Sequence, residues 1–73
     1  MSASGRTLTI LLNGSEHAVP EGMTAALLLE TLGLARERVA VELNGRVVRR
    51  GELGRCAFAE RDRVEVVQFV GGG

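Results

Sequence analysis

Two Asn-Gly pairs, each following a short run of alternating apolar residues, limit the fold more than any other feature of this chain. Asn13-Gly14 follows the run from Thr7 to Leu12, and Asn44-Gly45 follows the run from Val39 to Leu43. Asn and Gly both tolerate positive φ, and this dipeptide is the strongest short-range signal for a tight β-hairpin. The chain therefore predicts two β-hairpins.

The segment between the hairpins has the pattern of one amphipathic helix. Pro20 lacks a backbone N–H, so the return strand that starts at Ser15 is expected to end there. Thr24 is a suitable N-cap residue, and Gly33 can adopt the left-handed conformation that ends a helix. A buried stripe with i, i+3, i+4, i+7 spacing is predicted at Ala25, Leu28, Leu29 and Leu32.

The last predicted strand, Val64 to Val70, is apolar on both faces near its end. Val64 and Val66 share one face, whereas Val67 and Phe69 lie on the other. Such a strand is either central in a covered sheet or exposes one side to a partner. The segment before it, Glu52 to Phe58, has an ambiguous pattern, and its Leu53 and Phe58 are expected to complete the core.

These elements predict an α+β fold in the order ββαββ, with a mixed sheet of four to five strands packed on one main helix. Parallel pairing of the first and last strands at the sheet centre would make it a ubiquitin-like β-grasp. The 73 residues suffice for one domain. We predict a flexible N-terminus at residues 1–6, the domain at residues 7–70 and a flexible glycine tail at residues 71–73.

Composition argues against several classes of function. Nine acidic and nine basic residues give a net charge of zero, and Phe58 and Phe69 are the only aromatic residues. We therefore expect no binding to nucleic acid or to a membrane. The single cysteine, Cys56, favours a cytoplasmic protein and a small buried side chain. No metal site and no catalytic residues are expected, because the one histidine, His17, has no identifiable partner.

The chain closes on Gly71-Gly72-Gly73, directly after the last strand. Three extended residues span roughly 10 Å, and glycine has no side chain to block a narrow channel. A terminal carboxylate at Gly73 would be sterically open, but it is a poor electrophile until it is activated. The chain has no phosphate-binding loop and no lysine at all. Activation with ATP would thus require a separate enzyme, and no cofactor is expected to be bound.

The sequence resembles the ThiS family, the bacterial sulfur carriers of thiamine biosynthesis, from Leu8 to Gly73. The resemblance is strongest at the ending, Val64 to Gly73, and is supported by Leu11 to Gly14, Val19 to Leu32 and Val41 to Gly45. It implies that an E1-like adenylyltransferase converts the Gly73 carboxylate to an acyl-adenylate. Sulfur from a sulfur-donor enzyme then gives a thiocarboxylate, which thiazole synthase consumes. The carrier would be a protein co-substrate and not an enzyme.

Three alternatives stay open. The small subunit of molybdopterin synthase, or another thiocarboxylate carrier, would share the chemistry but serve another acceptor. A ubiquitin-like modifier would join Gly73 to a lysine of a target protein. A non-covalent β-grasp binding module would not need Gly72 and Gly73.

Two surfaces are candidates for partner contacts. Leu11, Val67 and Phe69 are predicted to form part of a docking face. Arg46, Arg49 and Arg50 lie around the second hairpin, where they form either a solvated edge that discourages strand pairing or a surface for an acidic partner.

One departure from the ThiS pattern is Glu60-Arg61-Asp62, where the family often has glycine at the middle position. If that position requires positive φ, Arg61 carries modest strain.

Overall fold

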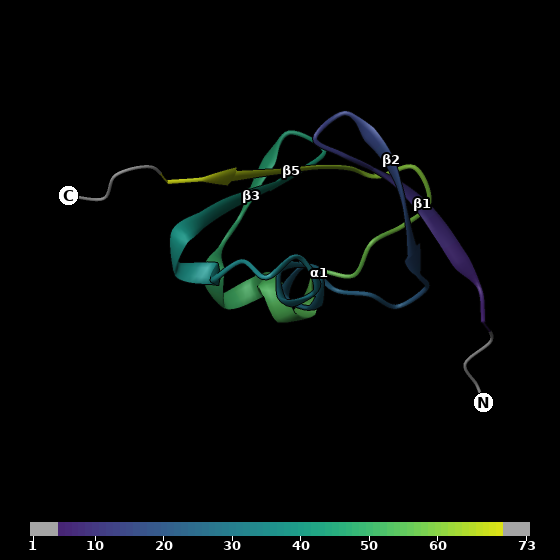
Figure 1. The fold of residues 1–73 in the computed structure, drawn as a ribbon, viewed down its shortest axis with the longest axis horizontal. Helices are drawn as coiled ribbons and strands as arrows, with labels where there is room; N and C mark the ends of the chain where they lie inside the picture. Colours follow the sequence, from purple (N-terminus) through teal and green to yellow (C-terminus); the bar gives the residue numbers. More distant parts are fainter. Residues whose placement is uncertain (1–4, 70–73) are drawn as a thin grey trace.

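The computed structural model describes residues 5–69, so the predictions for residues 1–4 and 70–73 lie outside it. The described chain forms one mixed sheet with a single α-helix lying across one face (Figure 1). The strands are β1 (Thr7–Leu12), β2 (Ser15–Pro20), β3 (Val39–Leu43), β4 (Arg46–Val48) and β5 (Arg63–Gln68). The helices are α1 (Ala25–Leu32) and the 3₁₀ helices η1 (Arg36–Arg38) and η2 (Arg50–Arg55).

The five strands follow the order β2-β1-β5-β3-β4. β1 and β5 run parallel, while the β1–β2, β3–β4 and β3–β5 pairs are antiparallel. The last strand therefore lies in the middle of the sheet, beside the first. This arrangement is the ubiquitin-like β-grasp, and it confirms the predicted fold class.

Both predicted hairpins are present, and their turns have the expected backbone conformation. Asn13 and Gly14 have φ of 50° and 86°, and Asn44 and Gly45 have φ of 53° and 86°. Positive φ at both central residues is the type I′ turn, whose twist matches that of the flanking strands.

Helix α1 has the predicted caps at both ends. The Thr24 hydroxyl accepts a hydrogen bond from the Leu27 N–H at 3.2 Å. Gly33 is left-handed with φ of 74°, and the Leu34 N–H donates to the Leu29 carbonyl at 2.9 Å. These bonds satisfy backbone groups that the helix ends would otherwise leave unpaired.

One residue of the predicted helical stripe is not buried. Leu32 is 37% exposed, because the helix ends there and Gly33 turns the chain, so that Leu34 packs against the core instead. Ala26, which was outside the predicted stripe, is buried. Ala25, Leu28 and Leu29 are buried as predicted.

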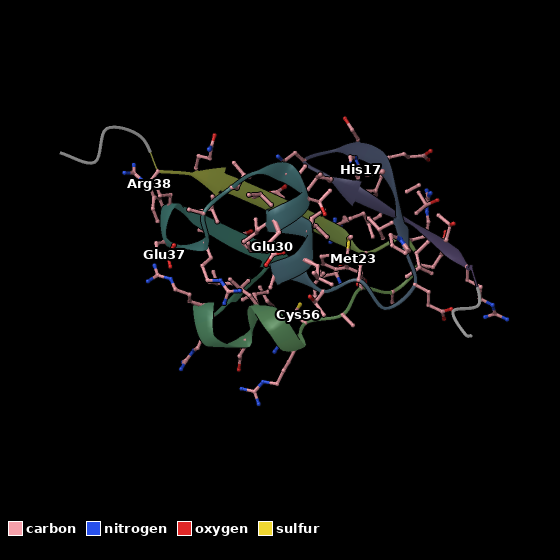
Figure 2. All side chains as sticks on the ribbon, turned by 60° about the horizontal axis from the view of Figure 1, so that its bottom comes forward. His17, Met23, Glu30, Glu37, Arg38 and Cys56 are labelled. Carbon is pink, nitrogen blue, oxygen red and sulfur yellow. The ribbon has the colours of Figure 1, made fainter. Side chains whose placement is uncertain are left out.

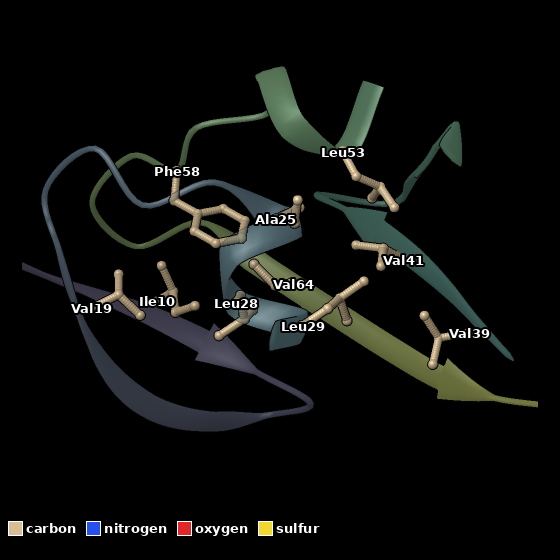
Figure 3. Packing of buried hydrophobic residues seen from close by; sticks show 11 residues of the cluster. Ile10, Val19, Ala25, Leu28, Leu29, Val39, Val41, Leu53, Phe58 and Val64 are labelled. Carbon is tan, nitrogen blue, oxygen red and sulfur yellow. The ribbon is translucent and has the colours of Figure 1, made fainter. Parts of the chain in front are cut away.

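The core lies between α1 and the inner face of the sheet (Figure 3). Leu53 from η2 and Phe58 both enter it, which confirms their predicted role and shows that the ambiguous segment begins as a 3₁₀ helix. Among residues 5–69, every buried side chain is apolar. No helix in this range is long and apolar enough to cross a membrane. The core residues are Ile10, Val19, Ala25, Ala26, Leu28, Leu29, Val39, Val41, Leu53, Phe58 and Val64.

The turn that precedes β5 has the anticipated strained residue. Arg61 has φ of 71°, a left-handed conformation that side chains with a Cβ adopt at a cost. Its guanidinium lies 3.3 Å from the Glu16 carboxylate, but both side chains are more than half exposed, so this ion pair contributes little stability.

Arg61→Gly is expected to be more stable than Arg61→Ala by about 1 kcal/mol. Both variants lose the ion pair with Glu16, so their difference reports the backbone conformation alone. Urea unfolding of the two variants measures it. An alanine variant at least as stable as the glycine variant would show that the left-handed conformation costs nothing here.

Candidate functional site

The candidate site is built around β5, because only Phe69 and Val70 separate this strand from the glycine tail. The strand ends at Gln68, whereas the sequence predicted an end at Val70, which lies outside the described residues. On one side β5 pairs with β1, with Leu12 opposite Val64. On the other it pairs with β3 along five positions, from Val39 opposite Gln68 to Leu43 opposite Val64. The Val64 side chain is fully buried. β5 is thus held at both edges and on its inner face.

The Asn13 side chain extends the pairing of β5 beyond the end of β1. Its Oδ1 accepts a hydrogen bond from the Val66 N–H at 2.9 Å, and its Nδ2 donates to the Val66 carbonyl at 3.4 Å. The Asn13 N–H also donates to the Val64 carbonyl at 2.8 Å. An asparagine amide has the same donor and acceptor groups as a peptide unit, so this turn residue substitutes for one further strand residue.

Asn44 holds β5 from the opposite side. Its Oδ1 accepts from the Arg63 N–H at 2.9 Å, and its own N–H donates to the Arg63 carbonyl at 2.7 Å. Its Nδ2 donates to Oδ1 of Asp62 at 3.1 Å. The two hairpin turns therefore both bond to the last strand, one through Val66 and the other through Arg63.

The turn before β5 is bonded to β1. Oε1 of Glu60 accepts from the Thr9 N–H at 3.0 Å, and the Arg61 N–H donates to the Thr9 carbonyl at 2.7 Å. Oδ2 of Asp62 accepts from the Ala59 N–H at 2.8 Å, which closes the turn. Glu60 and Asp62 thus position the chain, and both carboxylates are engaged by backbone groups.

At its other end, β5 leaves the sheet beside η1. The Phe69 N–H donates to the Arg38 carbonyl at 2.9 Å, and Figure 2 shows Arg38 next to the end of the strand. The expected modification site Gly73 and its lead residues Gly71 and Gly72 lie outside the described residues. What the structure provides is the base from which they continue.

The predicted docking residues lie on the outer face of the sheet, opposite α1. Val67 and Phe69 are each 55% exposed, so the prediction's premise of an open apolar side is met. Val67 lies opposite Ala40 on β3, and the 68% exposed Val47 is on β4, on the far side of β3. Leu11 is half-buried and lies opposite Arg63 on the same face. It is four positions from Val67 along β5, or about 13 Å, so it does not join the Val67 patch.

Other chemistry-bearing side chains stand apart from this exit. His17 is half-buried on β2, and Cys56 is half-buried after η2. Burial raises the pKa of the Cys56 thiol, and the Asp62 and Glu52 carboxylates raise it further. The thiol therefore stays protonated at neutral pH and is a poor nucleophile. Within residues 5–69, no group of three or more His, Cys, Asp or Glu side chains is placed to hold a metal ion.

Comparison with known proteins identifies the family. Residues 4–73 match the model of the ThiS family, so the chain, a β-grasp protein by its fold, belongs to the ThiS family. A crystal structure of the thiamine biosynthesis protein ThiS from Geobacter metallireducens superimposes with a TM-score of 0.76 and 35% identity, covering 90% of this chain and all of that one. A solution structure from the same organism gives 0.75, at 35% identity over 90% of this chain and 88% of that one.

Two relatives are named thiazole synthase and are much longer than this chain. The one from Magnetococcus marinus is 48% identical over 66 residues, and the one from Paramagnetospirillum magneticum is 35% identical over 66 residues. Each match covers 90% of this chain, which spans only about a fifth of either relative. An uncharacterised protein, ycf40 of Porphyra purpurea, is 28% identical over 68 residues, covering 93% of this chain and 96% of that protein.

Asn13→Gly tests the bonds between the first turn and β5. Glycine keeps the positive φ but loses both side-chain bonds to Val66, so we expect a loss of about 1–2 kcal/mol of unfolding free energy. Asn13→Asp retains the acceptor for the Val66 N–H and should lose less than the glycine variant. Urea unfolding gives both values. A glycine variant as stable as the parent would contradict the role assigned to the asparagine side chain.

Proposed function

We propose that this protein is a sulfur carrier for thiazole formation in thiamine biosynthesis, and that the carboxylate of Gly73 is the group that carries the sulfur. The main support is a combination of two observations. The chain is a ThiS-family β-grasp, and its central strand, paired at both edges, ends two residues before Gly71-Gly72-Gly73. The proposal requires Gly73 to bear a free carboxylate in the active form.

The chemistry proceeds in two steps. The Gly73 carboxylate attacks the α-phosphate of ATP on a separate E1-like adenylyltransferase, which yields an acyl-adenylate and releases diphosphate. Sulfur at the oxidation level of hydrosulfide, supplied by a sulfur-donor enzyme, then attacks the acyl carbon. The C–S bond forms as the C–O bond to AMP breaks, and AMP leaves with the electron pair. The carrier ends as a thiocarboxylate. ATP is thus bound by the partner, and the carrier acts as a co-substrate.

The geometry of the carrier suits this role. Three residues lie between Phe69 and Gly73, so a fully extended chain would span roughly 13 Å from one to the other. Because β5 is held by Asn13, Asn44 and the β3 backbone, this reach starts from a defined point. A defined starting point reduces the entropy that ordering the tail in an active site would cost.

Thiazole synthase is the proposed acceptor of the sulfur. The support is that proteins named thiazole synthase contain a segment similar to this whole domain. Covalent linkage of a carrier to its acceptor raises the effective concentration of one for the other. We place the carrier in the cytoplasm, where a lone thiol such as Cys56 stays reduced.

Intact-mass analysis tests the proposal. The protein is incubated with ATP, a sulfur donor and the cognate adenylyltransferase, and the products are fragmented. We expect replacement of one oxygen by sulfur, mapped to Gly73, and none in a variant lacking Gly72 and Gly73. No modification by a partner that is active on another carrier would contradict the proposal. A conjugate to lysine, or full function of the truncated variant, would favour the modifier or the non-covalent module.

The outer face is proposed to dock these partners through Val67 and Phe69. Phe69→Asp should raise the dissociation constant for the adenylyltransferase at least tenfold, because it places a charge on an apolar contact. Leu27→Asp, at a 49% exposed position on α1, is the matched control and should leave binding within about twofold. Calorimetric titration measures both. If both variants fold and bind the adenylyltransferase equally well, Phe69 is not part of the interface. If Phe69→Asp does not fold, Phe69 has a role in stability and the docking proposal fails.

A further inference from the structure

Four arginines lie at the end of the sheet where β5 leaves it. Arg36 and Arg38 belong to η1, and Arg49 and Arg50 follow β4. The Arg38 carbonyl is bonded to the Phe69 N–H, and Val39 lies opposite Gln68. Val48 pairs with Val41, so the residues that follow β4 lie beside the beginning of β3. We name these four residues, Arg36, Arg38, Arg49 and Arg50, the arginine collar.

The positive charge of the collar is not neutralised by ion pairs. All four side chains belong to exposed residues. Over the range that the structure describes, none of them makes a salt bridge, in contrast to Arg61 with Glu16. The acidic residues closest in sequence are Glu37 and Glu52, so the collar keeps an excess of positive charge. Exposed arginines without partners contribute little to stability, so folding does not require this grouping.

Three members of the collar share a hollow with an apolar floor. Arg36, Arg49 and Arg50 line a cavity of about 180 Å³ together with Val39, Val48 and Leu53, among others. A carboxylate side chain fits such a site, because its methylene groups contact the apolar floor while its oxygens bond to the guanidinium groups. The planar guanidinium also binds carboxylates in a bidentate manner, which lysine does not.

The position of the collar selects the kind of acid it meets. The collar is at the base of the tail, whereas ATP must be at its tip, where Gly73 reacts. A fully extended chain from Phe69 to Gly73 would span about 13 Å. When the tail is inserted, the collar therefore faces the rim of the partner's channel and not the nucleotide phosphates at its end.

We propose that the arginine collar docks onto acidic side chains of the adenylyltransferase at the entrance of the channel that receives the tail. The inference rests on the proposed function. Charge on both surfaces accelerates the encounter and aligns the tail with the entrance, and it allows release because exposed pairs are weak. Apolar contacts at Val67 and Phe69 would then lie beside the charged ones.

The test compares two double variants with the same change in net charge. Arg36→Gln/Arg49→Gln removes two charges from the collar. Arg46→Gln/Arg55→Gln removes two exposed arginines that line a different cavity, beside Cys56. The rate of acyl-adenylate formation is measured with the cognate adenylyltransferase at low and high salt, and thermal unfolding of both variants is recorded.

We expect the collar variant to lose about tenfold in kcat/KM at low salt, mainly through KM, and about threefold or less at 0.5 M salt. The control variant should stay within about twofold, and both should unfold at the temperature of the parent. Equal losses in the two variants would reduce the effect to overall charge and overturn the collar. A collar variant with the same kcat/KM as an actively adenylated parent would also overturn the collar proposal. A parent that is never adenylated would instead contradict the proposed function, and the collar with it.

Discussion

The bonding of β5 between the two hairpins is the constraint on which the rest of this structure depends. β5 comes last in the chain, yet it occupies the middle of the sheet and separates β1 from β3. The hairpins have no direct pairing with each other in the sheet, so β5 joins them. Asn13 from one turn and Asn44 from the other bond to its backbone at Val66 and Arg63. The strand that leads to the tail is therefore also the strand that completes the fold.

The two faces of β5 have different surroundings. The inner face contributes Val64 and Val66 to the core beneath α1, where burial of apolar area stabilises the fold. The outer face exposes Val67, and the exposed Phe69 directly follows the strand. A chain of this size has few residues to spare for a core. One strand thus contributes both to the core and to an exposed apolar surface.

Much of the fold could be predicted from local patterns. The Asn-Gly turns, the Thr24 and Gly33 caps and the alternation in β1 and β3 depend on neighbouring residues alone, and all were predicted correctly. Leu32 was not, because its burial depends on where the helix ends relative to the sheet. Comparison with the family pattern raised positive φ at position 61 only as a condition, and the φ of 71° at Arg61 meets it.

The features of the candidate site that the sequence did not predict depend on contacts between distant segments. Hairpin chemistry explains an asparagine at positions 13 and 44, but it does not show that their side chains bond to β5, more than 18 residues away in each case. Likewise, Arg36 and Arg49 are far apart in sequence and become neighbours only through the β3–β4 pairing. The Val67 patch and Leu11 share a face, but their separation follows from the register of β5.

Hydrogen exchange at the Val66 amide tests most directly whether β5 is a fixed base for the tail. This N–H is bonded to the Asn13 side chain in a turn, and not to a regular strand partner on that side. If β5 is held as described, the amide exchanges only through global unfolding, with a free energy equal to that from urea unfolding. Exchange through a local opening several kcal/mol less costly, while the Leu28 amide of α1 stays protected, would show that the tail leaves from a mobile strand and would contradict the account.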